Sequence, residues 1–195
     1  MARIMPEPPL VSALPDIVSS RIHQKSATGA NTQRIGRKGS HYRVDFVTHP
    51  LDADAARDWL DLRNEDDTVI VAVPQRKLDI GAPGLGAVDG GPQAGAALSV
   101  RGLTPNYAIR RGQLLNHTGS DGELRLYAAR AEVITDADGA AQILLETMLT
   151  WPALDGEVVD LRDPKIEGFA TVDPSAWLLD GNGYQTLQFS VEEAG

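Results

Sequence analysis

The chain has 195 residues and a formal net charge of −9, and this length allows one domain or two small ones. The sequence contains no cysteine, which excludes disulfide scaffolding, thiolate metal sites and cysteine nucleophiles. Hydrophobic residues make up 42% of the sequence but aromatic residues only 5%, so we expect an aliphatic core. The 19 glycines and 12 prolines favour turns and short strands over long helices, and the acidic balance argues against nucleic acid as the main partner.

The first predicted elements lie in a proline-rich region. Residues 6–16 are interrupted by prolines and predict an extended segment, and residues 17–22 predict a strand. Residues 24–41 contain one large apolar residue, Ile35, so they predict a long exposed loop. Residues 42–48 alternate in the way typical of a half-buried strand, with Tyr42, Val44, Phe46 and Thr48 on one face.

The segment 49–67 is the best helix candidate in the sequence. Asp52 or Asp54 can cap its first turn, and we expect Trp59 to anchor it to a sheet. Residues 68–74 are continuously apolar and predict a central strand.

A glycine-rich stretch over 78–96 predicts a linker or domain boundary. Residues 124–135 and 140–149 predict a hairpin, joined by a turn at 136–139 in which Gly139 can adopt a left-handed conformation. Further strands are predicted over 97–102, 112–117, 156–164, 167–173, 176–180 and 184–192. In the last of these, Gln185, Leu187, Phe189 and Val191 should face the core.

The basic residues gather near the N-terminus. Residues 1–43 contain seven Lys or Arg and two acidic residues, so the rest of the chain carries −14. A basic arm on an acidic body is complementary to a second copy of the same chain. Three basic residues of the predicted loop, Arg34, Arg37 and Lys38, are therefore our candidates for contacts between subunits. The alternative is a solvated arm without a partner.

The sequence shows no catalytic, cofactor-binding or metal-binding motif. None of the four histidines has metal-ligand spacing with another; His23 and His41 could meet across the loop, but exposed polar positions are the commoner outcome. The segment 136–139 differs from a calcium loop, because its glycine is the fourth residue and not the sixth. Residues 84–91 lack the spacing and the lysine of phosphate-binding loops, and no serine lies in a nucleophile elbow.

The ten aromatic residues are too few for a typical sugar-cleaving site, so we expect no enzyme activity. Trp59, Trp151 and Trp177 each lie in an apolar segment. We therefore expect all three to be buried and not to form a ligand platform.

The order of these segments resembles the distal tail proteins of siphophages, a family also found in prophage tails and gene-transfer particles. The segments that carry the resemblance are YRVDFVTHP, DAARDWLDL, VIVAVPQ, the glycine-rich stretch, AGAALSVRG, RRGQLLNH, RLYAARAEVITDADGAAQILLETML, LRDPKIEGF, AWLL and YQTLQFSVEEA, in that order between Arg43 and Ala194 or close to it. Two features differ from the family: ETMLTWPAL lacks the expected proline and arginine after the second hairpin strand, and Tyr42 stands where a tryptophan is expected.

The resemblance implies a mainly β fold with one helix. A tail-tube-like β-sandwich domain would use residues 1–80 and 163–195, and a small β-barrel or sandwich domain, residues 81–162, would be inserted into it. It implies a structural virion protein without cofactor, made in the cytoplasm of a bacterial host and located at the tail tip. Six copies would form a ring that joins the tail tube protein to the baseplate hub and tail fibre proteins. DNA would pass through the lumen without specific binding, and no membrane is involved.

Two other functions remain open. A tail-tube or other minor tail protein would share the fold, although the glycine-rich stretch favours the two-domain form. A carbohydrate-binding β-module for host attachment would need exposed aromatic residues, and an enzyme would need polar residues that converge in a pocket.

Overall fold

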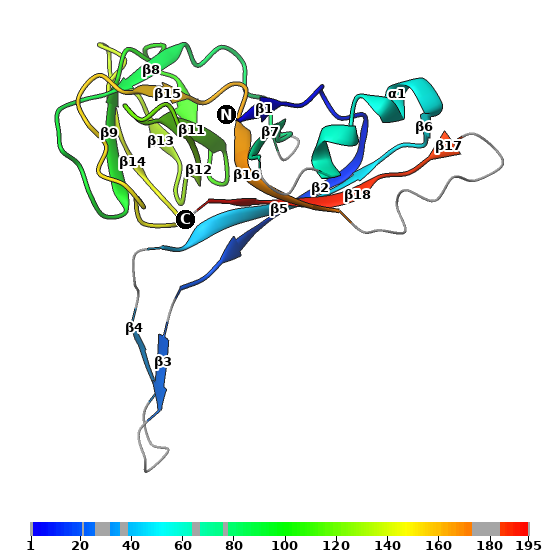
Figure 1. Cartoon of the computed structure of the whole chain (residues 1–195). Coiled ribbons are helices and arrows are strands. Elements are labelled where there is room, and N and C mark those ends of the chain that lie inside the picture. Colours follow the sequence, from blue (N-terminus) through cyan, green and yellow to red (C-terminus); the bar gives the residue numbers. More distant parts are fainter. Residues whose placement is uncertain are drawn as a thin grey trace.

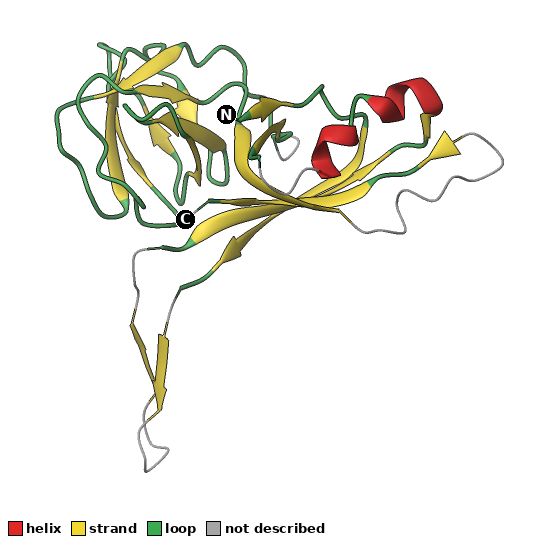
Figure 2. Cartoon of the chain, viewed as in Figure 1, coloured by secondary structure: helices red, strands yellow, loops and turns green. Residues whose placement is uncertain are grey.

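The structure is a computed structural model, which describes residues 2–20, 22–25, 32–35, 39–63, 67–75, 78–172 and 184–194. Over these residues the chain is mainly β, with two six-stranded sheets, three two-stranded pairs and one short α-helix (Figures 1 and 2). The predicted fold class, mainly β with one helix and of the β-sandwich type, is therefore confirmed. Neither sheet closes into a barrel within the described part of the chain.

The first sheet collects strands from both ends of the sequence. Its order is β1 (Arg3–Ile4), β7 (Val69–Ala72), β16 (Lys165–Val172), β18 (Gln188–Glu193), β5 (His41–Thr48) and β2 (Leu10–Val18). Neighbours are antiparallel except β1 and β7, which run parallel. The strand predicted over 17–22 therefore begins earlier, within the segment expected to be only extended.

The alternation in β5 and β18 places one face of each strand in the core. Tyr42, Val44 and Phe46 are buried and Arg43 between them is exposed, as the sequence predicts. Phe189 and Val191 of β18 are buried in the same way, and the Phe189 ring stacks on that of Phe46 with centroids 4.9 Å apart. The inward face of this sheet is therefore apolar along its central strands.

The helix predicted over 49–67 is much shorter in the structure. After β6 (Leu51–Asp52), which pairs with β17 (Tyr184–Gln185), come α1 (Ala53–Arg57) and a separate 3₁₀ turn, η1 (Leu60–Arg63). The Trp59 amide donates to the Ala56 carbonyl and the Leu62 amide donates to the Trp59 carbonyl. This three-residue spacing is that of a 3₁₀ turn, which is wound more tightly than an α-helix. Asp52 is the cap, since its carboxylate accepts from the Ala55 amide at 2.8 Å, and Trp59 is 2% exposed against Phe189, as expected.

The loop predicted over 24–41 is wrong in part, because it contains a hairpin. Strands β3 (Ile22–Lys25) and β4 (Thr32–Ile35) pair antiparallel and project from the body beyond the ends of β2 and β5 (Figure 1). His23 lies opposite Arg34, while His41 lies opposite Val18 in the sheet. The two histidines therefore do not meet across the hairpin, which agrees with the interpretation that they form no metal site.

The second sheet comes from one continuous stretch of chain. Its order is β12 (Leu124–Ala128), β11 (Leu114–Thr118), β15 (Val158–Asp160), β8 (Leu85–Val88), β9 (Ala97–Arg101) and β14 (Ala141–Leu144), all antiparallel. A small pair, β10 (Ala108–Ile109) with β13 (Val133–Ile134), lies beside it. One backbone bridge, Ala129 to Leu145, links the ends of its outermost strands without closing a barrel.

Two predictions fail in this sheet. The turn at 136–139 forms, with Gly139 at φ +76° and its amide bonded to the Asp136 carbonyl. The flanking runs, however, meet only at the single bridge between Ala129 and Leu145 and form no continuous hairpin ladder. Strand β12 pairs with β11 and β14 pairs with β9, because the first run breaks after Ala128. The glycine-rich stretch is not only a linker either, since it supplies the internal strand β8 between β15 and β9.

The hydrophobic core has two parts. One, between β8, β9, β11, β14 and β15, is confined to the second sheet and its loops. The other lies under the first sheet and includes Trp59 and Leu62 from the helical segment together with Leu114, Leu126 and Ala128 from the second sheet. Figure 1 shows the helical segment and the second sheet on the same side of the first sheet. The two sheets are therefore packed together through shared apolar contacts.

Candidate functional site

We call the contact between β11 and β12 of the second sheet and β5, β16 and β18 of the first sheet the seam. It contains a small cavity of about 80 Å³ with both polar and apolar walls. Its lining residues are His41, Thr68, Glu123, Leu124, Arg125, Thr150, Glu167, Glu193 and Ala194. Because polar groups from several elements converge on this cavity, we take it as the candidate functional site.

Carboxylates of the first sheet occupy the outer edge of β12. The Leu124 amide donates to Glu167 at 3.0 Å and the Leu126 amide donates to Glu193 at 2.6 Å. Without these carboxylates, the two amides would be free to donate to an added strand at this edge. Side chains of β16 and β18 therefore take the place of a neighbouring strand, and they protect this edge.

Glu193 connects the two sheets through both of its oxygens. Oε1 accepts from Leu126 of the second sheet, and Oε2 accepts from the Tyr42 amide of the first sheet at 2.7 Å. Each bond is charge-assisted when the carboxylate is ionised. One side chain thus fixes the distance between β5 and β12.

Two amide side chains complete the seam. The Asn116 side chain donates to the Lys165 carbonyl at 2.7 Å and accepts from the Lys165 amide at 2.5 Å. The Gln75 side chain likewise donates to the Leu114 carbonyl at 2.9 Å and accepts from the Leu114 amide at 3.0 Å. Each side-chain amide therefore bonds both the N–H and the C=O of one residue, as a neighbouring strand would. These bonds fix the two segments that connect the second sheet to the first.

The electrostatics of the seam are unusual at Glu193. Burial raises the pKa of its carboxyl to about 7, against the opposing effect of the bonds from Leu126 and Tyr42. Burial lowers the pKa of His41, but the hydrogen bonds to Glu192 and to the Gly39 carbonyl outweigh it, so that the pKa of His41 is raised. Glu193 therefore titrates near neutral pH, and the pKa of its neighbour His41 is raised as well.

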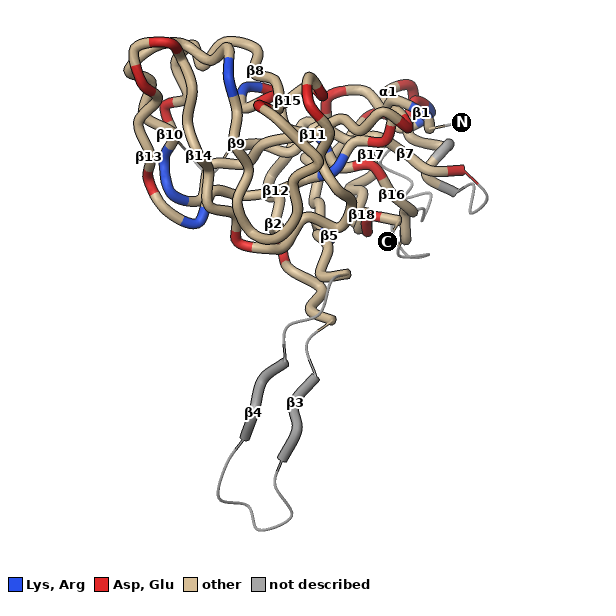
Figure 3. The backbone as a smooth tube through the Cα atoms, turned by 90° about the vertical axis from the view of Figure 1, so that its left-hand side faces the viewer, with Lys and Arg blue, Asp and Glu red and all other residues tan. Residues whose placement is uncertain are grey.

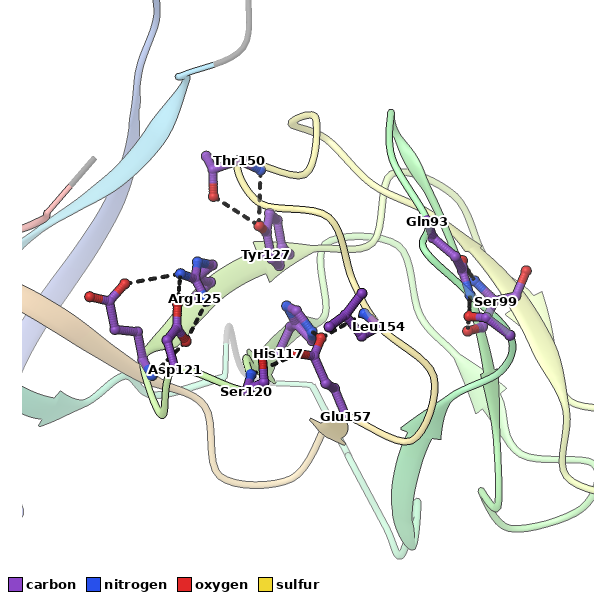
Figure 4. Close-up of polar contacts among 12 residues, drawn as sticks. Gln93, Ser99, His117, Ser120, Asp121, Arg125, Tyr127, Thr150, Leu154 and Glu157 are labelled. Carbon is purple, nitrogen blue, oxygen red and sulfur yellow. Dashed lines mark hydrogen bonds and ion pairs between the residues drawn. The ribbon is translucent and has the colours of Figure 1, made fainter.

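Arg125 is held beside the cavity by acidic neighbours (Figure 4). Its guanidinium bonds to Asp121 through two nitrogens, at 3.2 Å and 2.5 Å, and to Glu123 at 2.9 Å. The bond to Asp121 is the main cause that raises the pKa of Arg125. The guanidinium also lies 5.9 Å from the centre of the Trp151 ring. This ring is 56% exposed, so the expectation that Trp151 is buried is wrong.

A second polar cluster lies inside the second sheet, around His117 (Figure 4). The side chain of His117 is fully buried, and its Nε2 lies 2.6 Å from Glu157. Glu157 also accepts from the Ser120 and Leu154 amides. Burial lowers the pKa of His117, so a neutral ring donates from Nε2. Among the described residues its Nδ1 has no partner. The cluster ties two loops together and is not open to a ligand.

The residues predicted to make contacts between subunits lie away from the seam. Arg34 is in β4 of the projecting hairpin, while Arg37 and Lys38 lie outside the described residues, as does Trp177. No group of three or more His, Asp or Glu that could hold a metal ion occurs among the residues that the structure describes. The acidic residues are spread over both sheets instead of gathering at one place (Figure 3).

Sequence reasoning missed Glu167, Glu193 and Asn116. A signal for Glu193 was present, because it follows Leu187, Phe189 and Val191 at two-residue spacing and so falls on the inward face of its strand. An acid at such a position needs a buried partner. Asn116 gave no comparable signal, since its partner Lys165 is 49 residues away.

The sequence matches no family model and no curated protein. Within the described ranges, no helix is long and apolar enough to cross a membrane.

Proposed function

We propose that this chain is a structural subunit of a phage tail, the distal tail ring protein that joins the tail tube to the baseplate hub and fibres. The observation that carries the proposal is the form of the first sheet. Its long strands β2 and β5 lead into a hairpin that projects from the body, and the whole second sheet is inserted between β7 and β16 (Figure 1). A projecting arm and an inserted unit are what a ring subunit needs to reach its neighbours.

The edges of the first sheet support this role. Strand β2 has nine residues and, among the described strands, pairs only with β5. Val11 and Leu14 on it are 58% and 65% exposed, and Ile4 of β1, at the opposite edge, is 77% exposed. Two unlike edges on one sheet form a heterologous contact, which generates a ring when the rotation closes.

The uncovered face of the first sheet carries polar side chains along β5 and β18, together with the exposed Phe169 of β16. A shallow groove across β5, β16 and β18 is lined in part by Arg43, Asp45, Thr171 and Gln188, and Arg43 bonds to Asp45 at 3.1 Å. A face on which an arginine is paired with an aspartate would suit a lumen through which DNA passes without specific binding. Tail tube protein, hub and fibre proteins are the partners that this role implies, and the tail tip of a virion is the location.

The hairpin gives the sharpest test of the proposal. Deleting residues 26–39 should leave the monomer folded, as measured by circular dichroism and thermal unfolding, but should stop tail assembly in a complementation assay. Replacing Arg34, Arg37 and Lys38 together with glutamine should lower the yield of tails by at least about tenfold, since individually weak ion pairs are repeated around a ring. The matched control replaces Arg110 and Arg111. Normal tails from the deletion variant would contradict the proposal.

A carbohydrate-binding module for host attachment is the second candidate, and one observation favours it. Trp151 is 56% exposed with Arg125 over its ring, so it offers an aromatic surface beside polar groups. Binding to an array of bacterial surface glycans that Trp151→Ala abolishes, and Tyr184→Ala does not, would support this function over the structural one.

A further inference from the structure

The feature of the molecule with no assigned role is the group of titratable side chains around the seam cavity. Glu167 and Glu193 enter it from β16 and β18, His41 enters from β5, and Glu123 and Arg125 enter from the β12 side. Glu192 belongs to the same group, because its Oε1 lies 2.9 Å from Nε2 of His41. The group therefore spans the contact between the two sheets.

The geometry makes Glu193 the central member. Its two oxygens accept one backbone amide from each sheet, at 2.6 Å from Leu126 and 2.7 Å from Tyr42. If this side chain moves into water, both bonds are lost together. Among the described contacts it is the one carboxylate that bonds backbone amides of both sheets.

The charge of the group depends on two protonation events. With His41 neutral and Glu193 ionised, four carboxylates (Glu123, Glu167, Glu192 and Glu193) face the single guanidinium of Arg125. With His41 protonated and Glu193 neutral, three carboxylates face two cations. The excess negative charge of the group falls from three to one, and with it the net electrostatic repulsion among its members across the seam.

The other charged groups around Glu193 have partners of their own. Asp121 bonds to Arg125, and Arg43 of β5 bonds to Asp45. Glu146, on the segment after β14, accepts from the Tyr42 hydroxyl at 3.3 Å, and Arg3 pairs with Asp67 before β7. We assign the response of the seam to His41 and Glu193.

We propose that the seam is a pH-responsive joint, in which loss of protons from Glu193 and His41 loosens the second sheet from the first and protonation tightens it. This inference concerns the joint within one chain and does not depend on the proposed role in a tail.

The direction follows from proton linkage. Burial raises the pKa of Glu193 to about 7 in the closed seam, whereas a solvated glutamate has a pKa of about 4.3. The closed form therefore binds this proton more tightly than an open form does, and its advantage is lost as pH rises through about 7. The raised pKa of His41 acts in the same direction.

The experiment is hydrogen exchange of the full chain, with the protection factors of the Leu126 and Tyr42 amides measured at pH 6 and at pH 8.5 after correction for intrinsic exchange rates. We expect protection of both amides to fall by about tenfold over this range in the wild type. In Glu193→Gln the change should shrink to less than about twofold, while Glu132→Gln, an exposed glutamate that pairs with Arg110, should behave like the wild type. Equal protection at both pH values in the wild type would overturn the proposal.

A second measurement keeps the test decisive if Glu193→Gln does not fold. The side-chain carboxyl carbon of Glu193 can be followed by NMR between pH 4 and pH 9 in the wild type. A titration midpoint near 7 that coincides with the loss of amide protection supports the joint. A midpoint near that of an exposed glutamate, or a loss of protection at a different pH, contradicts it.

Discussion

The two large sheets have the same number of strands, but their strands come from differently distributed parts of the sequence. The first gathers six strands from distant segments, with strands of up to nine residues and two open edges among the described residues. The second is made from residues 85–160 alone, and none of its strands exceeds five residues. The first sheet thus has open edges and a projecting hairpin, while the second has its own core and is fixed to the first through the seam.

The largest expected effect is a loss of stability that tests whether the two sheets unfold as one unit. Trp59→Ala removes the largest buried side chain of the first core and should lower the free energy of unfolding by about 3–5 kcal/mol. Because Leu114 and Leu126 of the second sheet belong to this core, urea denaturation should still show one transition. Trp151→Ala, at a 56% exposed site, should change stability by less than about 0.5 kcal/mol. Two separate transitions would show that the sheets are independent.

The next effect concerns pH. Since burial raises the pKa of Glu193 to about 7, this residue contributes stability that is fully present below the pKa of the unfolded chain and is lost as pH rises through about 7. The free energy of unfolding of the wild type, relative to that of Glu193→Gln, should therefore decrease by up to about 3 kcal/mol between pH 4.5 and pH 8. Urea titrations at several pH values measure it. Parallel pH profiles for the two proteins would refute the assignment.

A smaller effect is expected at the other bridge across the seam. Asn116→Ala would leave the amide and the carbonyl of Lys165 without their side-chain partner and should cost about 2–3 kcal/mol, because both groups lie in a partly buried place. The control is Gln142→Ala, on an exposed position of β14. Equal stability of the two variants would mean that water replaces the amide and that the seam is looser than its geometry indicates.

The smallest effect tests the helical segment that covers the first sheet. Asp52→Ala removes the side chain that caps α1 and should cost about 1 kcal/mol. Asp54→Ala, whose carboxylate is 89% exposed and pairs with Arg57, should cost no more than about 0.5 kcal/mol. Thermal unfolding of both variants compares the two aspartates that the sequence offers as caps. A larger loss of stability for Asp54→Ala than for Asp52→Ala would contradict the assignment of Asp52 as the cap.

The sequence predicts the first sheet better than the second, for a physical reason. Strand β5 alternates because one face meets the core and the other meets water, so its pattern can be read locally. Strand β8 lies in a glycine-rich stretch and exists because β15 and β9 pair with it on either side. Glycine also fits closely there, since a Cβ on Gly86 would lie 2.9 Å from the Leu103 side chain and 3.2 Å from the Val159 carbonyl oxygen, so a larger residue would have to displace Leu103. Pairing of this kind is decided by the rest of the fold.

The seam was equally hard to predict. The bonds of Glu193 join residues 67 and 151 positions apart in sequence, and neither partner contributes a side chain to the contact. The turn at 136–139 was predicted correctly because its chemistry is local, whereas the hairpin around it was not, because β12 and β14 find partners elsewhere.

The most direct test of the central claim is cryo-electron microscopy of phage tails that contain this chain, with the chain built into the map. The proposal predicts a ring of six copies between the last tail-tube ring and the tip, with the β3–β4 hairpin of each copy against its neighbour. A particle without the chain in such a ring, or a single copy bound to glycan through Trp151, would contradict it.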